Sequence, residues 1–486
     1  MKNILKYINL LIVVLLLTSC EDDFLDVNVD PNNPTVVTPD LVLPVAQKYT
    51  ANLIQASDGG GRRANTLGNM LMYNWSQSDG FAWYPDEFKY NVTSSFYSSI
   101  FSDSYTSALK QYQILTQLEE KYDNYKAVGM IMKAYHFQLL VDFYGDVPYS
   151  EALLRKDNAT PVYDDASAIY SDLLVQLSAA IDLIKNANNP IAIGEDDTMF
   201  GGDMEEWIRF ANTIKLRIAV RSSNTAAMAE AFGEGTGFIT SDVLVNPGYS
   251  KDEGKQNPLW NLYATDASDV LTLTSKATCA TDYVLSYLSS TNDPRIDFLY
   301  EKPATGHLGV PQGLLDYDTP VLDAFIPELV SNVGSGILKA EDMGANIFSL
   351  AESYFNQAEA ALTQTSLGDA QDFYESGIEA SFDYLGASNA SAYYTQTAAN
   401  ISWNSSSNKL EAIITQKWIA TNGITAEQSW FDYNRTGYPS DLPISSQAST
   451  SDRPVRLYYP ASELSSNGAN VPTQPNAFTA KIFWAN

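Results

Sequence analysis

The 486-residue chain has few of the residues on which catalytic and nucleic-acid-binding sites usually depend. It contains two histidines and two cysteines, and 29 lysines and arginines stand against 58 aspartates and glutamates, for a formal net charge of −29. Because a surface this acidic repels a phosphate backbone, nucleic acid is not expected as a partner. The composition, 45% hydrophobic and 18% charged, is that of a globular protein.

Motifs of common enzymes are also missing. The sequence has no GxSxG, no HExxH and no GxxxxGK[ST] phosphate loop. Histidine-based catalysis or a zinc site would depend on His136, which borders an apolar helical face and is predicted to pack, and on His307, a loop residue without an assigned role. We therefore expect no catalytic residues, no metal and no cofactor.

The first 19 residues have the pattern of a secretory signal peptide. Lys2 and Lys6 precede an apolar run, Leu10 to Leu17, that is shorter than the roughly 18 residues needed to span a bilayer. Leu17-Thr18-Ser19-Cys20 then resembles the bacterial lipobox, in which the chain is cut before the cysteine and the sulfur is acylated. The sequence therefore predicts a lipid anchor at Cys20 that holds the protein to a membrane without spanning it.

The residues after Cys20 predict a tether. Residues 20–50 begin with a stretch rich in Pro, Asn and Asp and are predicted as a lipidated extended arm leading to the body, residues 51–486. Glu21-Asp22-Asp23 resembles the acidic export signal of Bacteroidetes surface lipoproteins, and ordinary tether acidity explains it equally well. Asp26–Asp30 starts like a calcium loop, but Pro31 replaces the turn glycine, so no metal is predicted.

With Cys20 acylated, Cys279 has no partner for a disulfide and is predicted to be a small core residue.

Beyond the arm, apolar residues recur with a helical period in segments 125–143, 207–218, 347–361 and 370–382. Their alternation of small and aromatic residues resembles tetratricopeptide repeats, without the strict period of about 34 residues. The predicted fold is mainly α: a tetratricopeptide-like helical scaffold with long irregular loops and little β structure. In region 223–346, glycine and proline punctuate short segments, so loops with at most a short hairpin are predicted to carry recognition there.

Segments spread over the whole chain resemble the SusD/RagB family of nutrient-binding outer-membrane lipoproteins. They are YHFQLLVDFYGDVPYSEAL from Tyr135, WIRFANTIKLRIAVR from Trp207, SLAESYFNQAEAAL from Ser349, ITQKWIA from Ile414, SWFDYNRTGYP from Ser429, PVRLYYPASE from Pro454 and the closing KIFWAN. Within them, Trp418 and Trp430 are predicted as packing rings, and Arg435 and Arg456 as charges held by local carboxylates.

The resemblance implies a cell-surface lipoprotein of the outer membrane that captures an oligomeric nutrient and delivers it to a SusC-like TonB-dependent transporter, over which it acts as a lid. It implies binding without bond cleavage. Glycans are the commonest cargo of the family, and a peptide is the alternative. Two other classes remain open: a secreted glycan hydrolase acting through two carboxylates, and a helical adaptor that binds only protein.

Two stretches place aromatic rings among polar residues that could hold a sugar. In NWSQSDGFAWYPDEF, from Asn74, Trp75 shares a helical face with apolar residues and is predicted to lie in the core. Trp83 follows the turn at Gly80 and is predicted as the principal stacking platform, with Tyr84 and Asp79 beside it.

The second stretch is NPLWNLYATD, from Asn257, where Trp260, Tyr263 and Asn261 are the candidate ligand residues. Sugars stack their C–H faces on such rings and hydrogen-bond to the polar side chains nearby. For Trp260, anchoring of the loop in the core is the stronger interpretation.

Overall fold

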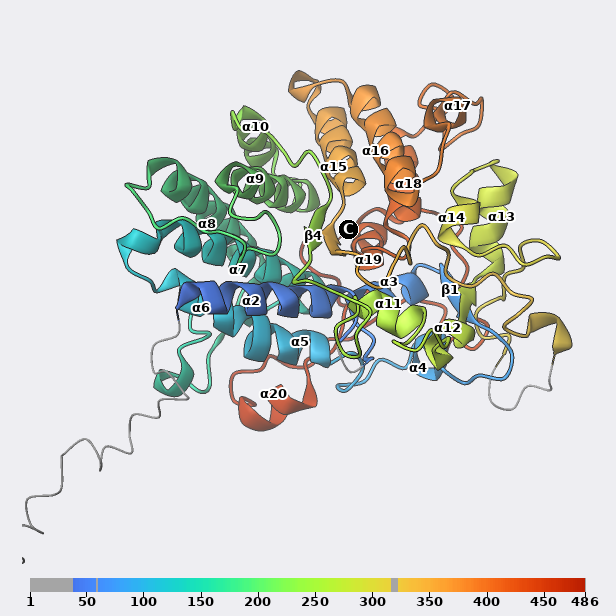
Figure 1. The fold of residues 1–486 in the computed structure, drawn as a ribbon, viewed down its shortest axis with the longest axis horizontal. Helices are drawn as coiled ribbons and strands as arrows, with labels where there is room; N and C mark the ends of the chain where they lie inside the picture. The colour runs from blue at the N-terminus through green and yellow to red at the C-terminus, as the bar shows by residue number, and fades with distance from the viewer. Residues whose placement is uncertain (1–37, 58–59, 316–321, 486) are drawn as a thin grey trace, which may run out of the picture.

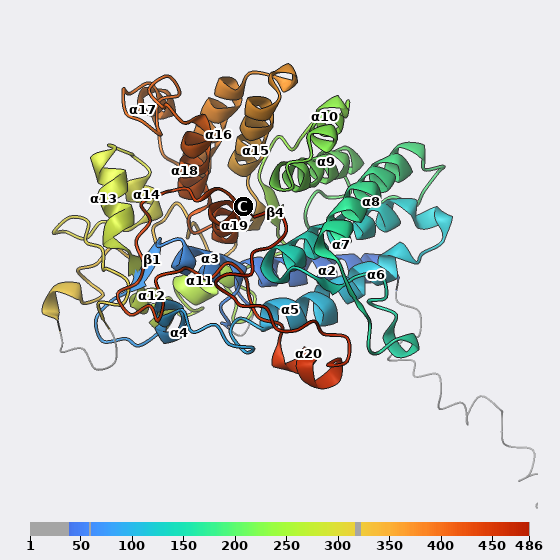
Figure 2. The same cartoon turned by 180° about the vertical axis from the view of Figure 1, so that it is seen from behind.

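The computed structural model describes residues 38–57, 60–315 and 322–485. The signal peptide, Cys20, the acidic residues after it and the calcium-like stretch lie outside these residues. The described part of the chain is mainly helical with three short pairs of strands (Figures 1 and 2). The predicted fold class, a mainly α scaffold of tetratricopeptide-like helix pairs with little β structure, is confirmed.

In chain order, the α-helices are α2 (Pro39–Ile54), α3 (Ala64–Leu71), α4 (Pro85–Lys89), α5 (Ser99–Asp103), α6 (Lys110–Thr116), α7 (Asp123–Tyr144), α8 (Ala166–Asn186), α9 (Met204–Arg221), α10 (Thr225–Gly233), α11 (Pro258–Tyr263), α12 (Leu273–Ala277), α13 (Asp282–Ser290), α14 (Ile296–Leu299), α15 (Leu350–Thr363), α16 (Ala370–Leu385), α17 (Ala390–Tyr394), α18 (Lys409–Thr421), α19 (Ala426–Thr436) and α20 (Ala461–Ser466). The other helical turns are the π-helix η2 (Ser104–Leu109) and the 3-10 helices η3 (Glu120–Tyr122), η4 (Arg155–Asp157), η5 (Asp323–Phe325) and η6 (Thr365–Leu367). The strands are β1 (Trp75–Gln77), β2 (Val147–Pro148), β3 (Tyr163–Asp164), β4 (Val243–Val245), β5 (Thr278–Ala280) and β6 (Ala345–Phe348).

The long helices form an arc of packed neighbours. Helix α7 packs on α8, α8 on α9, α9 on α10, α15 on α16 and α15 on α18. Figure 1 shows this arc along the top and left, with α2, α5 and α20 below it and α11 to α14 on the right. Side-chain caps fix where several of these helices begin, because a carboxylate, amide or hydroxyl accepts the free N–H groups of the first turn. The capping residues include Asp165, Asp203, Ser349, Asp369 and Asn408.

Three of the four predicted helices match α7, α9 and α16 within a few residues. In the fourth, the helical period predicted from Ile347 starts too early, because Ile347 lies in β6 and α15 begins only at Leu350. The small residues on the packing faces allow close approach: a Cβ added to Gly377 of α16 would lie 2.8 Å from the Phe355 ring of α15.

The predicted extended arm ends earlier than expected. Residues 39–50 belong to α2, so the prediction of an extended tether up to residue 50 is wrong for this part. Pro39 suits the first helical turn, where its missing N–H has no helical partner in any case. Gln47 and Thr50 then tie α2 to the scaffold, through Asp197 Oδ1 (2.6 Å) and His136 Nε2 (2.8 Å) respectively.

Region 223–346 is more structured than its composition predicts. It contains α10 to α14 and the strands β4 and β5. Strand β4 pairs with β6, which begins at the end of this region, and β5 pairs with β1, far outside it. Strand β5 pairs antiparallel with β1, with Trp75 opposite Ala280 and Gln77 opposite Thr278. The named strands β4 and β5 do not form a hairpin with each other, but a short antiparallel turn in which Thr265 bridges Leu271 agrees with the expected short hairpin.

One joint between the N-terminal segment and the scaffold is unusually close. A Cβ added to Gly68 of α3 would lie 2.1 Å from the backbone nitrogen of Glu427 and 2.2 Å from the carbonyl carbon of Ala426, both in α19. Only glycine fits at this crossing, because the obstacle is backbone that a side-chain rotation cannot move.

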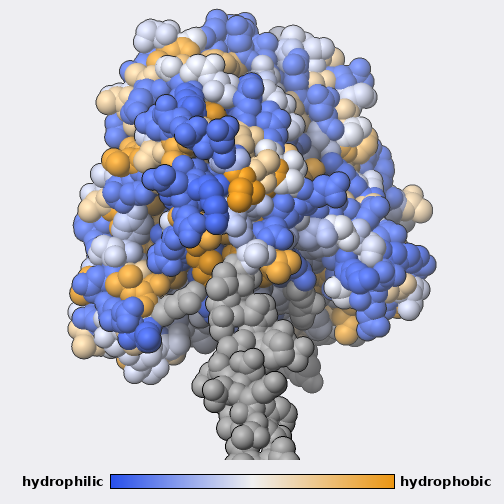
Figure 3. Space-filling view, turned by 60° about the vertical axis from the view of Figure 1, so that its left-hand side comes forward, coloured by the Kyte–Doolittle hydropathy of each residue, from blue (hydrophilic) through white to orange (hydrophobic). Residues whose placement is uncertain are grey.

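Among the described residues, α8 alone has the length and apolar composition of a membrane-spanning helix. The same composition occurs in core helices, and α8 packs between α7 and α9 with Leu173 and Leu177 buried. Asp182 and Lys185 lie on its exposed side. Its packing on α7 and α9 identifies α8 as a scaffold helix. On the face that Figure 3 shows, hydrophobic residues form small separate groups among hydrophilic ones.

The two candidate histidines and Cys279 have structural roles. His136 is buried beside Tyr112, and burial lowers its pKa to about 3, so the ring is neutral. His307 lies within hydrogen-bond distance of Ser331 Oγ (3.0 Å) and Asp297 Oδ1 (2.8 Å). Cys279 is fully buried, which raises its pKa, as expected of an inert core thiol.

The roles predicted for the family-like segments hold with one exception. Trp418 and Trp430 are buried packing rings, and Arg435 is held by Glu359 and Asp432.

Arg456 differs. No carboxylate of the described residues lies within ion-pair distance of it; its guanidinium lies 5.5 Å from the Tyr459 ring centre, and burial lowers its pKa. Asp146 still favours the charge of Arg456 through space, so the prediction of a carboxylate partner holds only in part, without a close ion pair.

Candidate ligand-binding site

The fold brings the two predicted ligand stretches together. Pairing of β1 with β5 places the segment that contains Trp83 beside the segment that follows α11. Two side-chain contacts reinforce it: Tyr84 Oη lies 2.6 Å from Thr278 Oγ1, and Trp83 Nε1 donates to Thr274 Oγ1 at 3.3 Å. Residues separated by about two fifths of the chain therefore form one face of the molecule.

Trp83 is partly exposed and held from several sides. Its backbone N–H donates to Gln77 Oε1 (2.9 Å), and its carbonyl accepts from Arg62 Nη1 (2.7 Å). Phe81 meets the indole edge-on, with ring centres 6.0 Å apart. A ring fixed in this way loses little conformational freedom when a ligand packs on it.

The chain next to Thr274 adds apolar surface near Trp83. Val270, Leu271 and Leu273 are 56%, 52% and 59% exposed.

The neighbours predicted for Trp83 do not face solvent. Tyr84 is fully buried, with the Arg62 guanidinium 4.9 Å from its ring centre, and burial raises its pKa. Asp79 is nearly buried; its Oδ2 accepts from the Leu322 N–H (3.0 Å), and its own N–H donates to Phe325 O (2.8 Å). The prediction of ligand contacts is wrong for Tyr84, and in this structure Asp79 holds the chain at η5.

Helix α11 positions the second group of predicted ligand residues, and most of their side chains point into the core. Tyr263 is buried, with its hydroxyl 2.7 Å from Thr66 Oγ1 and its ring 4.9 Å from that of Trp75, so the ligand role predicted for it is wrong. Trp260 is partly buried against the core, and its indole N–H is buried without a partner among the described residues. Asn261 is partly exposed and stays a candidate.

Trp75 lies in the core as predicted, but in β1 and not on a helix, because α3 ends at Leu71.

A polar hollow of about 460 Å³ adjoins the Trp83 segment. Its lining residues are Gly60, Gly61, Arg62, Pro85, Asp86, Glu87, Thr93, Ser95, Phe96, Tyr97, Ser98 and Ser99. Arg62 links it to Trp83, since Nη1 donates both to the Trp83 carbonyl and to Glu87 Oε1 (3.1 Å). We call this space the α4 hollow.

The charges of the α4 hollow balance each other. Burial raises the pKa of Glu87, while Arg62 and the Tyr97 hydroxyl, which donates to Glu87 Oε1 at 2.9 Å, act in the opposite direction. Burial disfavours the charge of Arg62, but Glu87 and three nearby tyrosines outweigh it, so the Arg62 pKa is raised. The hollow thus offers both donors and acceptors for hydroxyl groups.

Arg62, Glu87 and Tyr97 were not among the predicted site residues. The available signal was the pair Arg62-Arg63 after a glycine run in a chain with few basic residues.

The scaffold consists of packed helix pairs, and its surface carries an aromatic ring next to a polar hollow. These features define a helical-repeat protein with a surface suited to ligand binding. The particular family follows from comparison: a model described as "Starch-binding associating with outer membrane" matches residues 31–460, so the chain belongs to the SusD-like family. Comparison with curated protein sequences finds no significant match.

Solved structures show the same fold. A chitin-binding SusD homolog from Flavobacterium johnsoniae has a TM-score of 0.77 at 22% identity, with 91% of this chain and 98% of that chain covered. A SusD homolog from Bacteroides uniformis gives 0.72 at 22% identity, covering 92% and 99%. A further protein, described as chitin-binding, gives 0.68 at 25% identity, covering 92% and 100%.

Proposed function

We propose that the protein binds a glycan at the cell surface and delivers it to a SusC-like TonB-dependent transporter in the outer membrane. The observation that carries the glycan proposal is Trp83, a partly exposed ring whose backbone and indole N–H are all held by neighbouring residues. Membership of a starch-binding, outer-membrane-associated family and the chitin-binding relatives support the same class of ligand.

The surface formed by Trp83 and the α4 hollow has the chemistry needed to bind a sugar chain. A sugar ring can place its C–H face on the Trp83 indole, and the apolar burial stabilises the complex as any aromatic contact does. Hydroxyl groups then find a guanidinium donor in Arg62 and a carboxylate acceptor in Asp86, which is exposed at the rim of the α4 hollow. Asn261 on α11 is a further hydrogen-bonding candidate on the second segment.

Attachment and delivery complete the proposal. A lipid on Cys20 would hold the body at the membrane through the residues that precede α2, on the outer face of the cell. Closing over a transporter requires a large protein interface, because water must be excluded along the rim of the barrel. Co-purification from membranes is therefore expected to recover a barrel protein of transporter size.

The test uses the unmodified mature protein on a glycan array, followed by calorimetry with the best oligosaccharide and chromatography of the mixture. We expect saturable binding and an unchanged oligosaccharide. Shortened products would favour a hydrolase, and binding of peptides but of no glycan would favour the peptide-binding alternative. Binding of neither, with a recovered protein partner, would favour an adaptor.

A further inference from the structure

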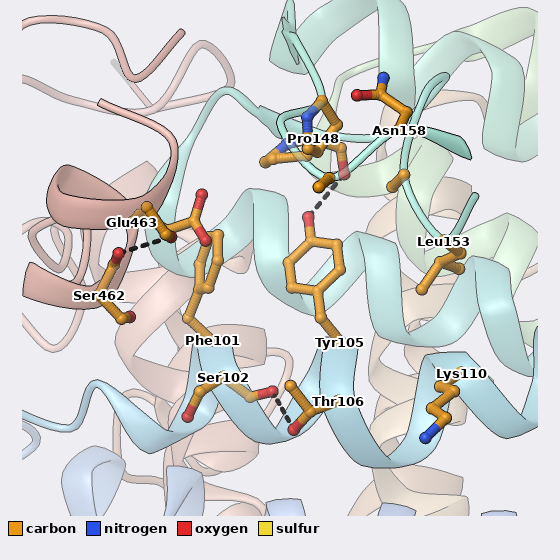
Figure 4. Close-up of a pocket in the computed structure, with 14 residues that line it drawn as sticks. Phe101, Ser102, Tyr105, Thr106, Lys110, Pro148, Leu153, Asn158, Ser462 and Glu463 are labelled. Carbon is orange, nitrogen blue, oxygen red and sulfur yellow. Dashed lines mark hydrogen bonds between the residues drawn. The ribbon is translucent and has the colours of Figure 1, made fainter. Parts of the chain in front are cut away.

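A second hollow, of about 490 Å³, lies at the C-terminal end of α5. Its walls come from α5, η2, the chain after β2, and α20, as Figure 4 shows. We call it the η2 hollow. Its volume is within the range of about 300 to 1,000 Å³ common for small-ligand sites.

Two aromatic rings form the apolar side of the η2 hollow. Phe101 and Tyr105 stand side by side, with ring centres 4.9 Å apart. The Tyr105 hydroxyl donates to the Pro148 carbonyl (2.6 Å), which fixes a ring that is only partly buried. Tyr105 lies in the π-helix η2, and π-helical turns occur frequently at functional sites.

The opposite wall contributes a carboxylate. Glu463 of α20 accepts on Oε2 from the Tyr163 hydroxyl (3.0 Å) and from Asn467 Nδ2 (3.5 Å). These donors orient the carboxyl group, and Oε1 has no hydrogen-bond partner in the part of the chain that the structure describes. Figure 4 shows Glu463 close to Phe101, across from Lys110 and Leu153.

Helix α5 contributes to the lining of both hollows. Ser99 lines the α4 hollow and Ser102 the η2 hollow, and residues three apart are neighbours on a helix surface. At the end of the same helix, Arg63 Nη2 pairs with Asp103 Oδ2 at 2.8 Å. A bound chain that follows α5 would therefore meet hydroxyl and charged groups.

We infer that the η2 hollow is a second saccharide subsite, which holds a further unit of the chain bound at Trp83; this rests on the proposed function. A fixed, partly exposed tyrosine ring offers a stacking surface, and the free carboxylate oxygen accepts hydroxyl hydrogen bonds.

The experiment compares a disaccharide with a longer oligosaccharide of the series that binds best on the array. The longer probe should bind the unmodified protein more tightly. In Tyr105→Leu and Glu463→Gln, the longer probe should lose affinity by about tenfold while the disaccharide binds as before. Trp83→Ala should weaken both probes.

Tyr105→Phe keeps the ring and removes the bond to Pro148, so it separates stacking from local packing. It should bind the longer probe more tightly than Tyr105→Leu does. The subsite is overturned if Tyr105→Leu and Glu463→Gln bind the longer probe as tightly as the unmodified protein does. It is also overturned if these variants lose the same affinity for both probes. If the unmodified protein binds no glycan, the proposed function fails together with the subsite; if it binds both lengths equally, only the subsite fails.

Discussion

The indole N–H of Trp83 donates a hydrogen bond to the hydroxyl of Thr274, which lies 191 residues further along the chain. The contact joins the segment after β1 to helix α12, next to the exposed residues Val270, Leu271 and Leu273. Because the partner of the ring comes from so distant a part of the sequence, the orientation of Trp83 depends on the completed fold.

Trp83→Ala should weaken glycan binding by roughly tenfold or more, because an aromatic contact and its burial are typically worth about 1 to 3 kcal/mol. The ring also packs, partly buried, against the core and bonds to Thr274, so the variant should lose some free energy of unfolding as well, and affinity is compared on folded protein. Calorimetry and denaturant unfolding measure the two effects. Unaltered affinity in a folded variant would remove Trp83 from the site.

Thr274→Val offers a matched test of how the ring is held. It removes the hydroxyl that accepts from Trp83 and keeps the size of the side chain. We expect a smaller loss of affinity than for Trp83→Ala, since the stacking surface remains.

Trp260→Ala should lower the free energy of unfolding by about 2 to 4 kcal/mol and leave glycan affinity unchanged, because the ring packs against the core. Trp260→Phe should recover most of the stability, since it fills much of the space and removes an indole N–H that is buried without a partner. Thermal unfolding and calorimetry decide between the roles: lost affinity at an unchanged melting temperature would make Trp260 a ligand residue.

Stability should depend on pH through Glu427. Burial raises its pKa from 4.5 to about 7, so protons bind more tightly in the folded state. The stabilisation from this proton is complete below pH 4.5 and is lost as the pH rises to about 7. At about 1.4 kcal/mol per pH unit, the change is on the order of 3 kcal/mol.

Glu427→Gln removes this titration and keeps the shape of the side chain. The free energy of unfolding of the variant, minus that of the unmodified protein, should be more favourable at pH 8 than at pH 4. Denaturant unfolding at both pH values measures it. An equal difference at the two values would contradict the assignment.

Cys20→Ala should give an exported protein that the outer membrane no longer retains, because the acyl chains would be missing. Membrane fractionation with a salt wash measures retention, and a variant that stays bound after the wash would show that another element holds the protein.

The sequence predicts the scaffold better than the site, because the helices depend on patterns local in the sequence and the site depends on contacts between distant segments. The helices α7, α9 and α16 follow from a local apolar period that burial in a helix-pair core preserves. Burial of Tyr84 and Tyr263 depends on pairing of β1 with β5 across some 200 residues, which leaves no local pattern. Because Tyr84 and Tyr263 stand among polar residues in the sequence, the local pattern predicts exposure for both rings.

The partial exposure of Trp83 could be predicted from its neighbours in the sequence. Gly80 and Pro85 bracket it and mark the end of regular structure, and the structure leaves its ring partly exposed. Arg62 was missed because its importance comes from two acceptors, the carbonyl of Trp83 and the carboxylate of Glu87, that are distant from it in sequence.

The crossing of Gly68 with α19 bears on how the Trp83 segment is positioned. Helix α3 lies directly before β1 and the Trp83 segment, and at Gly68 it touches the backbone of α19 with no side chain between them to slide or compress. Any side chain at Gly68 would push α3 away from α19, and with it the following segment that carries Trp83. The position of the Trp83 ring therefore depends on a glycine that lies outside the lining of the α4 hollow.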